Sequence, residues 1–204
     1  MKKNVCIIGS GFSSLSAACY LAQSGYQVQI FEKNSTPGGR ARQLKKDGFV
    51  FDIGPSWYWM PDVFEKFFAD FGKQVSDYYQ LERLDPGYQV YFGHRDTITI
   101  GDSLEKIYAT FEQVEQGSAA KLKKFIDKAA DNYKIAMDEL VYRPGLSPLE
   151  LITPDTLKKI GYFFSNIKKE VAKEFKNPKL AQILKFPVLF LGAKPADTPA
   201  FYNF

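Results

Sequence analysis

The chain has 204 residues, of which 45% are hydrophobic and 25% charged, with a formal net charge of +4. That length suffices for a domain with a sizeable core, and the composition is that of an ordinary soluble enzyme. The modest charge and the lack of a recognition motif argue against nucleic-acid binding, and the longest strongly apolar run, residues 186–193, is too short to cross a bilayer.

The first 32 residues carry the pattern of a βαβ unit. An apolar stretch at residues 5–8 enters a Gly-x-Gly-x-x-Ser turn that starts at Gly9, and an Ala-rich helical stretch follows. A second apolar strand, residues 28–31, then ends on Glu32, about 20 residues after the second glycine. This spacing is typical of a turn that holds the pyrophosphate of a dinucleotide. A structural βαβ turn without a ligand remains the alternative.

Each position of this turn has a physical role in the predicted site. Gly9 permits the tight turn, and Gly11 lets the backbone come close to phosphate. Glu32 is placed to accept hydrogen bonds from a ribose. The N–H groups that open the helix point at negative charge, which the helix dipole favours. These N–H groups belong to Phe12, Ser13 and Ser14, the last of which replaces the third glycine of the usual pattern.

A second cradle for a ligand follows between residues 33 and 56. Gly38 and Gly39 can adopt positive φ and let the backbone lie flat against a ligand, while Arg40 offers a forked donor suited to phosphate. Two short strands then flank a turn at residues 46–48. The exit from the second strand places small residues where a flat ring could stack. The residues of this exit are Asp52, Gly54, Pro55 and Ser56, and we expect Asp52 to brace the backbone or contact a cofactor rather than to act as a base.

Beyond residue 56 the chain changes character. An aromatic run at residues 57–60 precedes a helix with a phenylalanine stripe, which is either a core face or a cavity wall. Alternation and turn chemistry then predict a β-hairpin over residues 89–100, with His94 solvated in its turn. Capping signals and periodicity predict helices at 104–113, 119–142 and 157–175.

Residues 153–186 are strongly basic, with eight lysines against three acids. A basic amphipathic helix that also exposes aromatic residues can lie on an anionic membrane surface. The solvated face of a core helix explains the same lysines equally well. Both interpretations remain open at this point.

Two motifs carry a resemblance to a known family. Glu-x(5)-Gly-Gly-Arg-Ala, from Glu32, and Gly-Phe-x-Phe-Asp-x-Gly-Pro-Ser, from Gly48, resemble the amino-terminal signature of the bacterial phytoene desaturases, which are flavoproteins. Residues 186–202 resemble a stretch near the middle of those chains. The resemblance implies FAD as cofactor and a carotenoid or other polyene as substrate. It assigns no catalytic side chain and no metal, because the flavin carries the chemistry.

The expected fold class is α/β. We expect a Rossmann-like FAD-binding βαβ region over residues 1–83 and the first part of a β plus helical domain, substrate-binding and membrane-associating, over 84–204. The family implies a longer chain, so we expect an amino-terminal portion that lacks the carboxy-terminal half of the same protein. A non-catalytic, truncated nucleotide-binding or membrane-associating fragment is the alternative. We expect a cytoplasmic location, with peripheral contact at the inner face of the membrane left open, and Cys6 and Cys19 as small buried residues.

Overall fold

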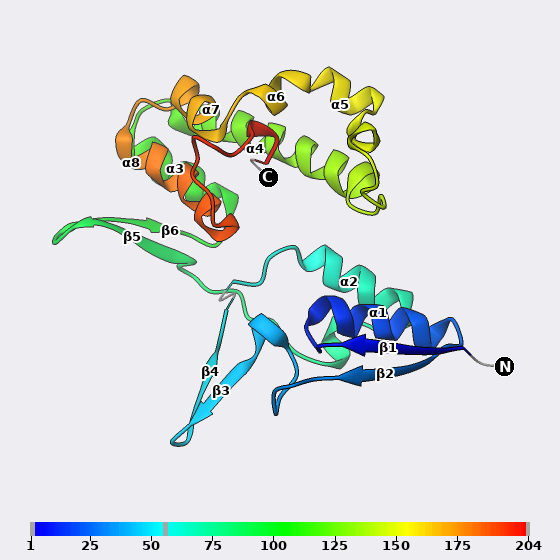
Figure 1. Ribbon diagram of the computed structural model, residues 1–204. Coiled ribbons are helices and arrows are strands. Elements are labelled where there is room, and N and C mark those ends of the chain that lie inside the picture. Colours follow the sequence, from blue (N-terminus) through cyan, green and yellow to red (C-terminus); the bar gives the residue numbers. More distant parts are fainter. Residues whose placement is uncertain (1–2, 55–56, 203–204) are drawn as a thin grey trace. The chain divides into compact units, whose positions relative to one another are not determined.

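The computed structural model describes residues 3–54 and 57–202, and the chain divides into two compact units between Gln80 and Leu81 (Figure 1). The elements of the first unit are β1 (Asn4–Ile8), α1 (Phe12–Gln23), β2 (Gln27–Phe31), β3 (Gln43–Lys46), β4 (Phe49–Asp52) and α2 (Pro61–Asp70), with single 3₁₀ turns at Gly39–Ala41 and Val75–Asp77. Those of the second unit are β5 (Tyr88–Gly93), β6 (Asp96–Ile100), α3 (Leu104–Val114), α4 (Ser118–Ile135), α5 (Pro154–Lys158), α6 (Ile160–Phe164), α7 (Ile167–Glu174) and α8 (Pro178–Lys185). A π-helical turn, Ala136–Leu140, extends α4, and 3₁₀ turns lie at Pro148–Leu151, Phe186–Leu191 and Ala200–Tyr202.

The first unit begins with the predicted βαβ arrangement. β1 and β2 pair in parallel, from Asn4 opposite Gln27 to Ile8 opposite Phe31, and α1 connects them. Parallel strands need such a crossover, because the chain must return to the end of the sheet where the first strand began, and a tight turn can join only antiparallel strands. Val5 and Ile7 are half-buried, whereas Ile8 is 88% exposed, so only one face of this two-stranded sheet is covered by described residues.

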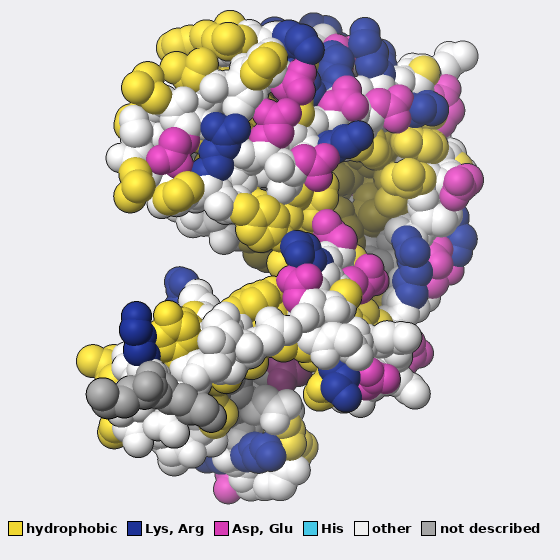
Figure 2. All heavy atoms as spheres, turned by 90° about the vertical axis from the view of Figure 1, so that its right-hand side faces the viewer, with side chains coloured by type: hydrophobic (Ala, Val, Ile, Leu, Met, Phe, Trp, Pro, Cys, Tyr) yellow, Lys and Arg dark blue, Asp and Glu magenta, His cyan; other side chains and the backbone are white. Residues whose placement is uncertain are grey.

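The prediction that Cys6 and Cys19 are buried is wrong. Both are free and exposed. Cys6 alternates with Val5 and Ile7 along β1 and therefore points to the uncovered face of the sheet. Figure 2 shows that many hydrophobic side chains also remain on the surface in the face it presents.

Aromatic residues join α2 to α1. Phe64 meets Phe12 edge to face, with ring centroids 6.3 Å apart, and Phe67 meets Tyr20 in the same way at 5.9 Å. The Tyr20 hydroxyl also donates a hydrogen bond to an Asp70 carboxylate oxygen at 2.7 Å. These contacts place Phe64 and Phe67 against α1, where both side chains are half-buried.

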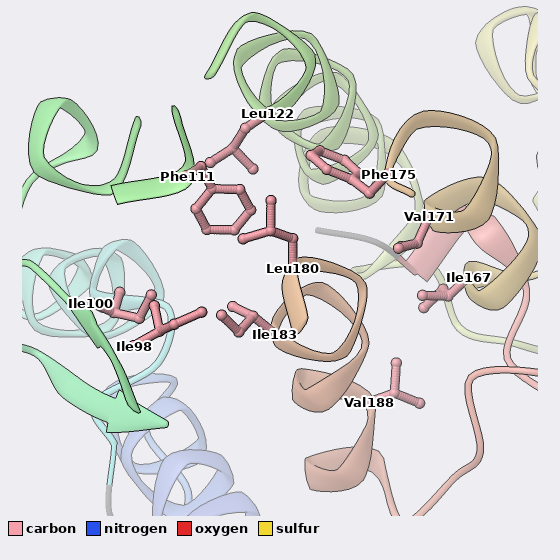
Figure 3. Packing of buried hydrophobic residues seen from close by; sticks show 10 residues of the cluster. All are labelled: Ile98, Ile100, Phe111, Leu122, Ile167, Val171, Phe175, Leu180, Ile183 and Val188. Atoms are coloured by element: carbon pink, nitrogen blue, oxygen red, sulfur yellow. The ribbon is translucent and has the colours of Figure 1, made fainter. Parts of the chain in front are cut away.

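The hydrophobic core described by the structure lies in the second unit. It joins the β5–β6 hairpin to α3, α4, α7 and α8, and Phe111, Leu122 and Leu180 point toward one another at its centre (Figure 3). Phe111 and Phe175 pack edge to face at 6.1 Å. Ile98 and Ile100 extend the core along β6, because alternate residues of this strand face the helices.

The single helix predicted over residues 157–175 does not form. This part of the basic stretch breaks into α5, α6 and α7, with interruptions at Lys159 and at Ser165 and Asn166. Ser165 and Asn166 are extended, and the Asn166 side chain caps α7 by accepting a hydrogen bond from the Lys169 N–H at 2.9 Å. Capping therefore starts a new helix where periodicity predicted continuity. No helix within residues 3–54 and 57–202 has the length and apolarity needed to cross a membrane.

Candidate functional site

The glycine turn between β1 and α1 is open to a ligand. Gly9 has a φ of 92° and donates its N–H to the Phe31 carbonyl at 2.7 Å, which ties the turn to the end of β2. Gly11 caps α1 without a side-chain acceptor, so the first N–H groups of the helix lack an intrahelical partner and receive no cap. A Cβ built on Gly9 or Gly11 would meet nothing within 4 Å. Free space and free donors together make a cradle for an anion such as pyrophosphate.

Glu32 lies directly after β2, beside this turn. Its Oε2 accepts hydrogen bonds from the N–H and the hydroxyl of Ser10, at 2.8 and 2.7 Å. Its Oε1 accepts from the N–H and the side-chain amide of Asn34, at 2.9 and 2.7 Å. Hydrogen bonds to the charged form, led by that of the Asn34 N–H, lower the pKa of Glu32 from 4.5 to about 2. The carboxylate is therefore ionised and held in one orientation.

This network predicts an unusually acidic Glu32. We expect its carboxyl to titrate near pH 2 when followed by carbon NMR. Since the folded pKa lies below the unfolded value, the contribution of Glu32 to stability is present above about pH 4.5 and is lost as the pH falls toward 2. Ser10→Ala should move the midpoint upward, whereas Ser35→Ala in the same loop should leave it unchanged. A midpoint near 4.5 in the parent chain would contradict the network.

The second glycine pair lies against the first. The Gly38 N–H donates to the Ser10 carbonyl at 2.8 Å, and Gly11 and Gly38 form an isolated parallel bridge. A Cβ on Gly39 would lie 3.1 Å from the Gly11 Cα. Positive φ angles of 107° and 60° at Gly38 and Gly39 make this close approach possible. Two segments that are separate in the sequence thus form one surface of bare backbone.

Arg40 and Gly54 meet at the edge of this surface. A Cβ on Gly54, whose φ is 102°, would lie 2.3 Å from the Arg40 carbonyl oxygen, so only glycine fits there. The neighbouring Ile53 N–H donates to the Arg42 carbonyl at 2.8 Å, which holds the two segments together. The Arg40 side chain is exposed and forms no ion pair with another described residue. Its guanidinium is therefore available to an anionic ligand.

The remaining predicted site residues are less central. The Phe12 ring packs against Phe64 of α2, so this residue offers the turn only its backbone, and Ser13 and Ser14 lie in the first turn of α1. Asp52 accepts a hydrogen bond from the Gln43 side chain across the β3–β4 hairpin at 3.0 Å. Pro55 and Ser56 lie outside the described residues.

The sequence did not reveal the residues that orient Glu32. Ser10 stands between the two glycines, where any small residue fits, and Asn34 lies in a loop with no periodic signal. No spacing rule links either residue to Glu32. His94 is exposed in the β5–β6 turn, and the described residues include no group of three histidines, cysteines or acids that could hold a metal ion.

A family model described as an NAD(P)-binding Rossmann-like domain matches residues 7–73. This match covers the glycine turn, Glu32 and the second glycine pair. The first unit therefore contains a dinucleotide-binding fold of the Rossmann type.

Curated relatives match almost the whole chain. A carotenoid 3,4-desaturase of Haloarcula japonica is 41% identical over 98% of this chain and 41% of its own length. A zeta-carotene-forming phytoene desaturase of Myxococcus xanthus is 34% identical over 98% of this chain and 39% of its own length. A 4,4′-diapophytoene desaturase of Staphylococcus haemolyticus is 33% identical over 98% of this chain and 40% of its own length. The chain thus spans about two fifths of the length of these relatives.

Solved structures share the fold at lower sequence identity. A putrescine oxidase variant aligns over 100% of this chain and 41% of its own length, with a TM-score of 0.62 and 20% identity. Wild-type putrescine oxidase bound to putrescine aligns with a TM-score of 0.58 at 19% identity, over 100% of this chain and 41% of its own. These likenesses concern the fold alone.

Proposed function

We propose that this chain, which is a homologue of the carotenoid desaturases over 98% of its length, forms the adenosine-diphosphate-binding part of an FAD-dependent carotenoid desaturase. The observation that carries the proposal is the single surface formed by the glycine turn, Glu32 and the second glycine pair. We place the site residues predicted from the sequence on this surface. The enzyme class rests on the relatives, which are named as desaturases.

The described residues fit FAD. The open space at Gly9 and Gly11, together with the uncapped start of α1, can accept the pyrophosphate. Glu32 can accept hydrogen bonds from the ribose, and Arg40 can bind a phosphate oxygen. When bound, FAD supplies a hydride acceptor for the oxidation of a carbon–carbon single bond to a double bond. The residues of this chain bind and orient, and none is assigned to proton transfer.

The proposed substrate is a carotenoid or another long polyene, because every relative described above is named for one. We assign its binding to the region that follows residue 83, together with chain that corresponds to the rest of the relatives. The uncovered face of β1 and β2 fits this proposal, since a longer protein offers strands and helices to cover it. In the alternative, a nucleotide-binding fragment without activity, the first unit would bind the nucleotide in the same way.

A fusion tests the proposed activity. This chain is joined to the part of the Myxococcus xanthus phytoene desaturase that lies beyond the matched region, and the fusion is expressed in a phytoene-producing host. We expect carotenoids with a longer conjugated system, seen as absorption at longer wavelength. The same fusion with Gly11→Val, in which a side chain fills the phosphate cradle, should produce none. A fusion that folds and retains FAD but leaves the carotenoids unchanged would contradict the proposal.

We also propose that α5 and α6 touch the inner face of a membrane from the cytoplasm. Leu157 and Ile160 are half exposed and Phe164 is 85% exposed. Lys158 and Lys159 lie between Leu157 and Ile160 in the chain; Lys158 is exposed and pairs with Asp155 at 2.7 Å, and Lys159 is half-buried and donates a hydrogen bond to the Asn132 side chain at 2.8 Å. Exposed apolar side chains beside cations suit an anionic lipid surface. This arrangement uses two short helices rather than the continuous helix expected from the sequence.

Vesicle sedimentation tests this contact. We expect the chain to bind phosphatidylglycerol vesicles more tightly than phosphatidylcholine vesicles, and less tightly as salt is raised. Phe164→Ala should weaken the binding by roughly fivefold, because a buried ring is lost. Phe49→Ala, a change at an exposed phenylalanine of β4, is the matched control and should have no effect. Equal binding by all three proteins would contradict the assignment to α5 and α6.

A further inference from the structure

We propose that the Asn34 carboxamide occupies the position on Glu32 that a ribose hydroxyl takes in the complex, and that a bound nucleotide displaces this carboxamide. Ser10 is the positioning residue that holds the carboxylate during this exchange. The inference deepens the proposed function and rests on it, because it takes the glycine turn and Glu32 as a nucleotide site. It concerns two residues to which neither the motif nor the family resemblance assigned a role.

The Glu32 carboxylate has no spare acceptor site in the described structure. An ionised carboxylate offers about four lone-pair positions. Four donors at 2.7–2.9 Å fill them, two from Ser10 on Oε2 and two from Asn34 on Oε1. A ribose that hydrogen-bonds to Glu32 must therefore replace at least one donor.

The four donors differ in how easily they can leave. The N–H groups of Ser10 and Asn34 belong to the backbone of the turn and of the loop after β2. Ser10 is 4% exposed, so its hydroxyl has little room to leave. The Asn34 side chain is exposed, so its carboxamide can rotate into water and exchange one hydrogen bond for another at small cost. Asn34 is thus the donor that a ligand displaces, and Oε1 is the oxygen that the ligand reaches.

Ser10 has a different role because its two bonds converge on the other oxygen. Its N–H and hydroxyl both bind Oε2, and its carbonyl accepts the Gly38 N–H at 2.8 Å. Ser10 thereby connects the phosphate turn, the ribose-binding carboxylate and the second glycine pair. Loss of the Ser10 hydroxyl removes one of the two hydrogen bonds to Oε2, so the carboxylate has more freedom in the unbound protein. Ordering the carboxylate then costs more conformational entropy when a ligand binds.

The experiment compares two probes that contain only the adenosine diphosphate part of the cofactor. ADP and 2′,3′-dideoxy-ADP differ in the ribose hydroxyls alone. Their dissociation constants are measured by calorimetry for the parent chain, Asn34→Ala, Ser10→Ala and Ser35→Ala. Ser35 follows Asn34 in the same exposed loop, and no hydrogen bond joins it to Glu32, so Ser35→Ala is the matched control.

We expect the two variants to change ADP affinity in opposite directions. Asn34→Ala should tighten ADP binding by roughly threefold, because the competing donor is gone, and should leave dideoxy-ADP unchanged. Ser10→Ala should weaken ADP binding by about as much and raise the pKa of Glu32, as only a group acting on that carboxylate would do. In proton–nitrogen NMR of the parent chain, the Asn34 side-chain amide should move toward its solvent-exposed shift with ADP but not with dideoxy-ADP.

Two failures are distinguishable. If the parent prefers ADP to dideoxy-ADP, but Asn34→Ala binds ADP equally or more weakly, the displacement is wrong and the nucleotide site stands. If the parent chain shows no saturable ADP binding, or no preference between the two probes, the proposed nucleotide site itself fails and the inference with it. Circular dichroism of each variant verifies that it is folded, and the exposed Asn34 leaves that variant free of packing changes.

Discussion

Leu180→Ala is expected to lower the free energy of unfolding of the second unit by about 3 kcal/mol or more, the range for a large-to-small change in a closed core. Leu180 has no exposed surface and points toward Phe111 and Leu122, which are each 1% exposed (Figure 3). Because Phe111 and Leu122 are themselves tightly packed, they cannot move far enough to fill the space left by the lost atoms. The cost therefore includes a cavity as well as the lost burial.

Leu146→Ala provides the matched control, since Leu146 is 86% exposed. We expect the control to change stability by less than about 0.5 kcal/mol. Urea unfolding followed by far-ultraviolet circular dichroism measures both changes, because most helices of the described chain belong to the second unit. Similar losses in the two variants would show that the core in Figure 3 does not stabilise this unit.

Gly54→Ala is expected to destabilise the first unit by roughly 3 kcal/mol. Two costs combine: a positive φ of 102°, and a Cβ placed 2.3 Å from the Arg40 carbonyl oxygen. That oxygen is part of the backbone, so the strain can be relieved only by moving backbone, either at residue 54 or in the Gly39–Ala41 turn that lies against it. We therefore expect ADP affinity to fall as well, since this turn carries the second glycine of the pair.

Gly48→Ala separates the two costs. Gly48 also has a positive φ, 82°, but a Cβ there would meet nothing within 4 Å. This variant should lose only about 1 kcal/mol and keep its ADP affinity. Tryptophan fluorescence follows the first unit selectively, because both tryptophans, Trp57 and Trp59, belong to it. Equal losses in the two glycine variants would show that the contact between Gly54 and Arg40 is absent.

The βαβ arrangement could be predicted from the sequence because its signals are local. Apolar strands, a glycine turn and an acidic residue at the right distance need no knowledge of the remaining fold. The same holds for the β5–β6 hairpin, whose turn residues and alternation are read over a dozen positions. The assignment of residues 1–83 to FAD and 84–204 to substrate remains a prediction about function.

Other features depend on contacts that no local pattern encodes. The closeness of Gly54 to Arg40, and of Gly39 to Gly11, arises from how separate turns pack, and the partners of Glu32 follow from that packing. Burial of Cys6 was inferred from strand composition, but it depends on whether a second layer covers the sheet. The break before α7 does have a local signal, because Asn166 is a residue type that caps helices. The helical periodicity of the surrounding residues favoured one continuous helix over this signal, and that prediction was wrong.

The most direct measurement of the central claim is an NMR titration of the nitrogen-15-labelled chain with ADP. The account predicts saturable shifts confined to the backbone amides of the glycine turn, the loop after Glu32 and the Gly39–Ala41 turn. Gly11→Val should abolish these shifts while the spectrum of the second unit stays unchanged. Saturable shifts centred elsewhere, or no shifts at all in the folded chain, would contradict the assignment of a nucleotide-binding surface to the first unit.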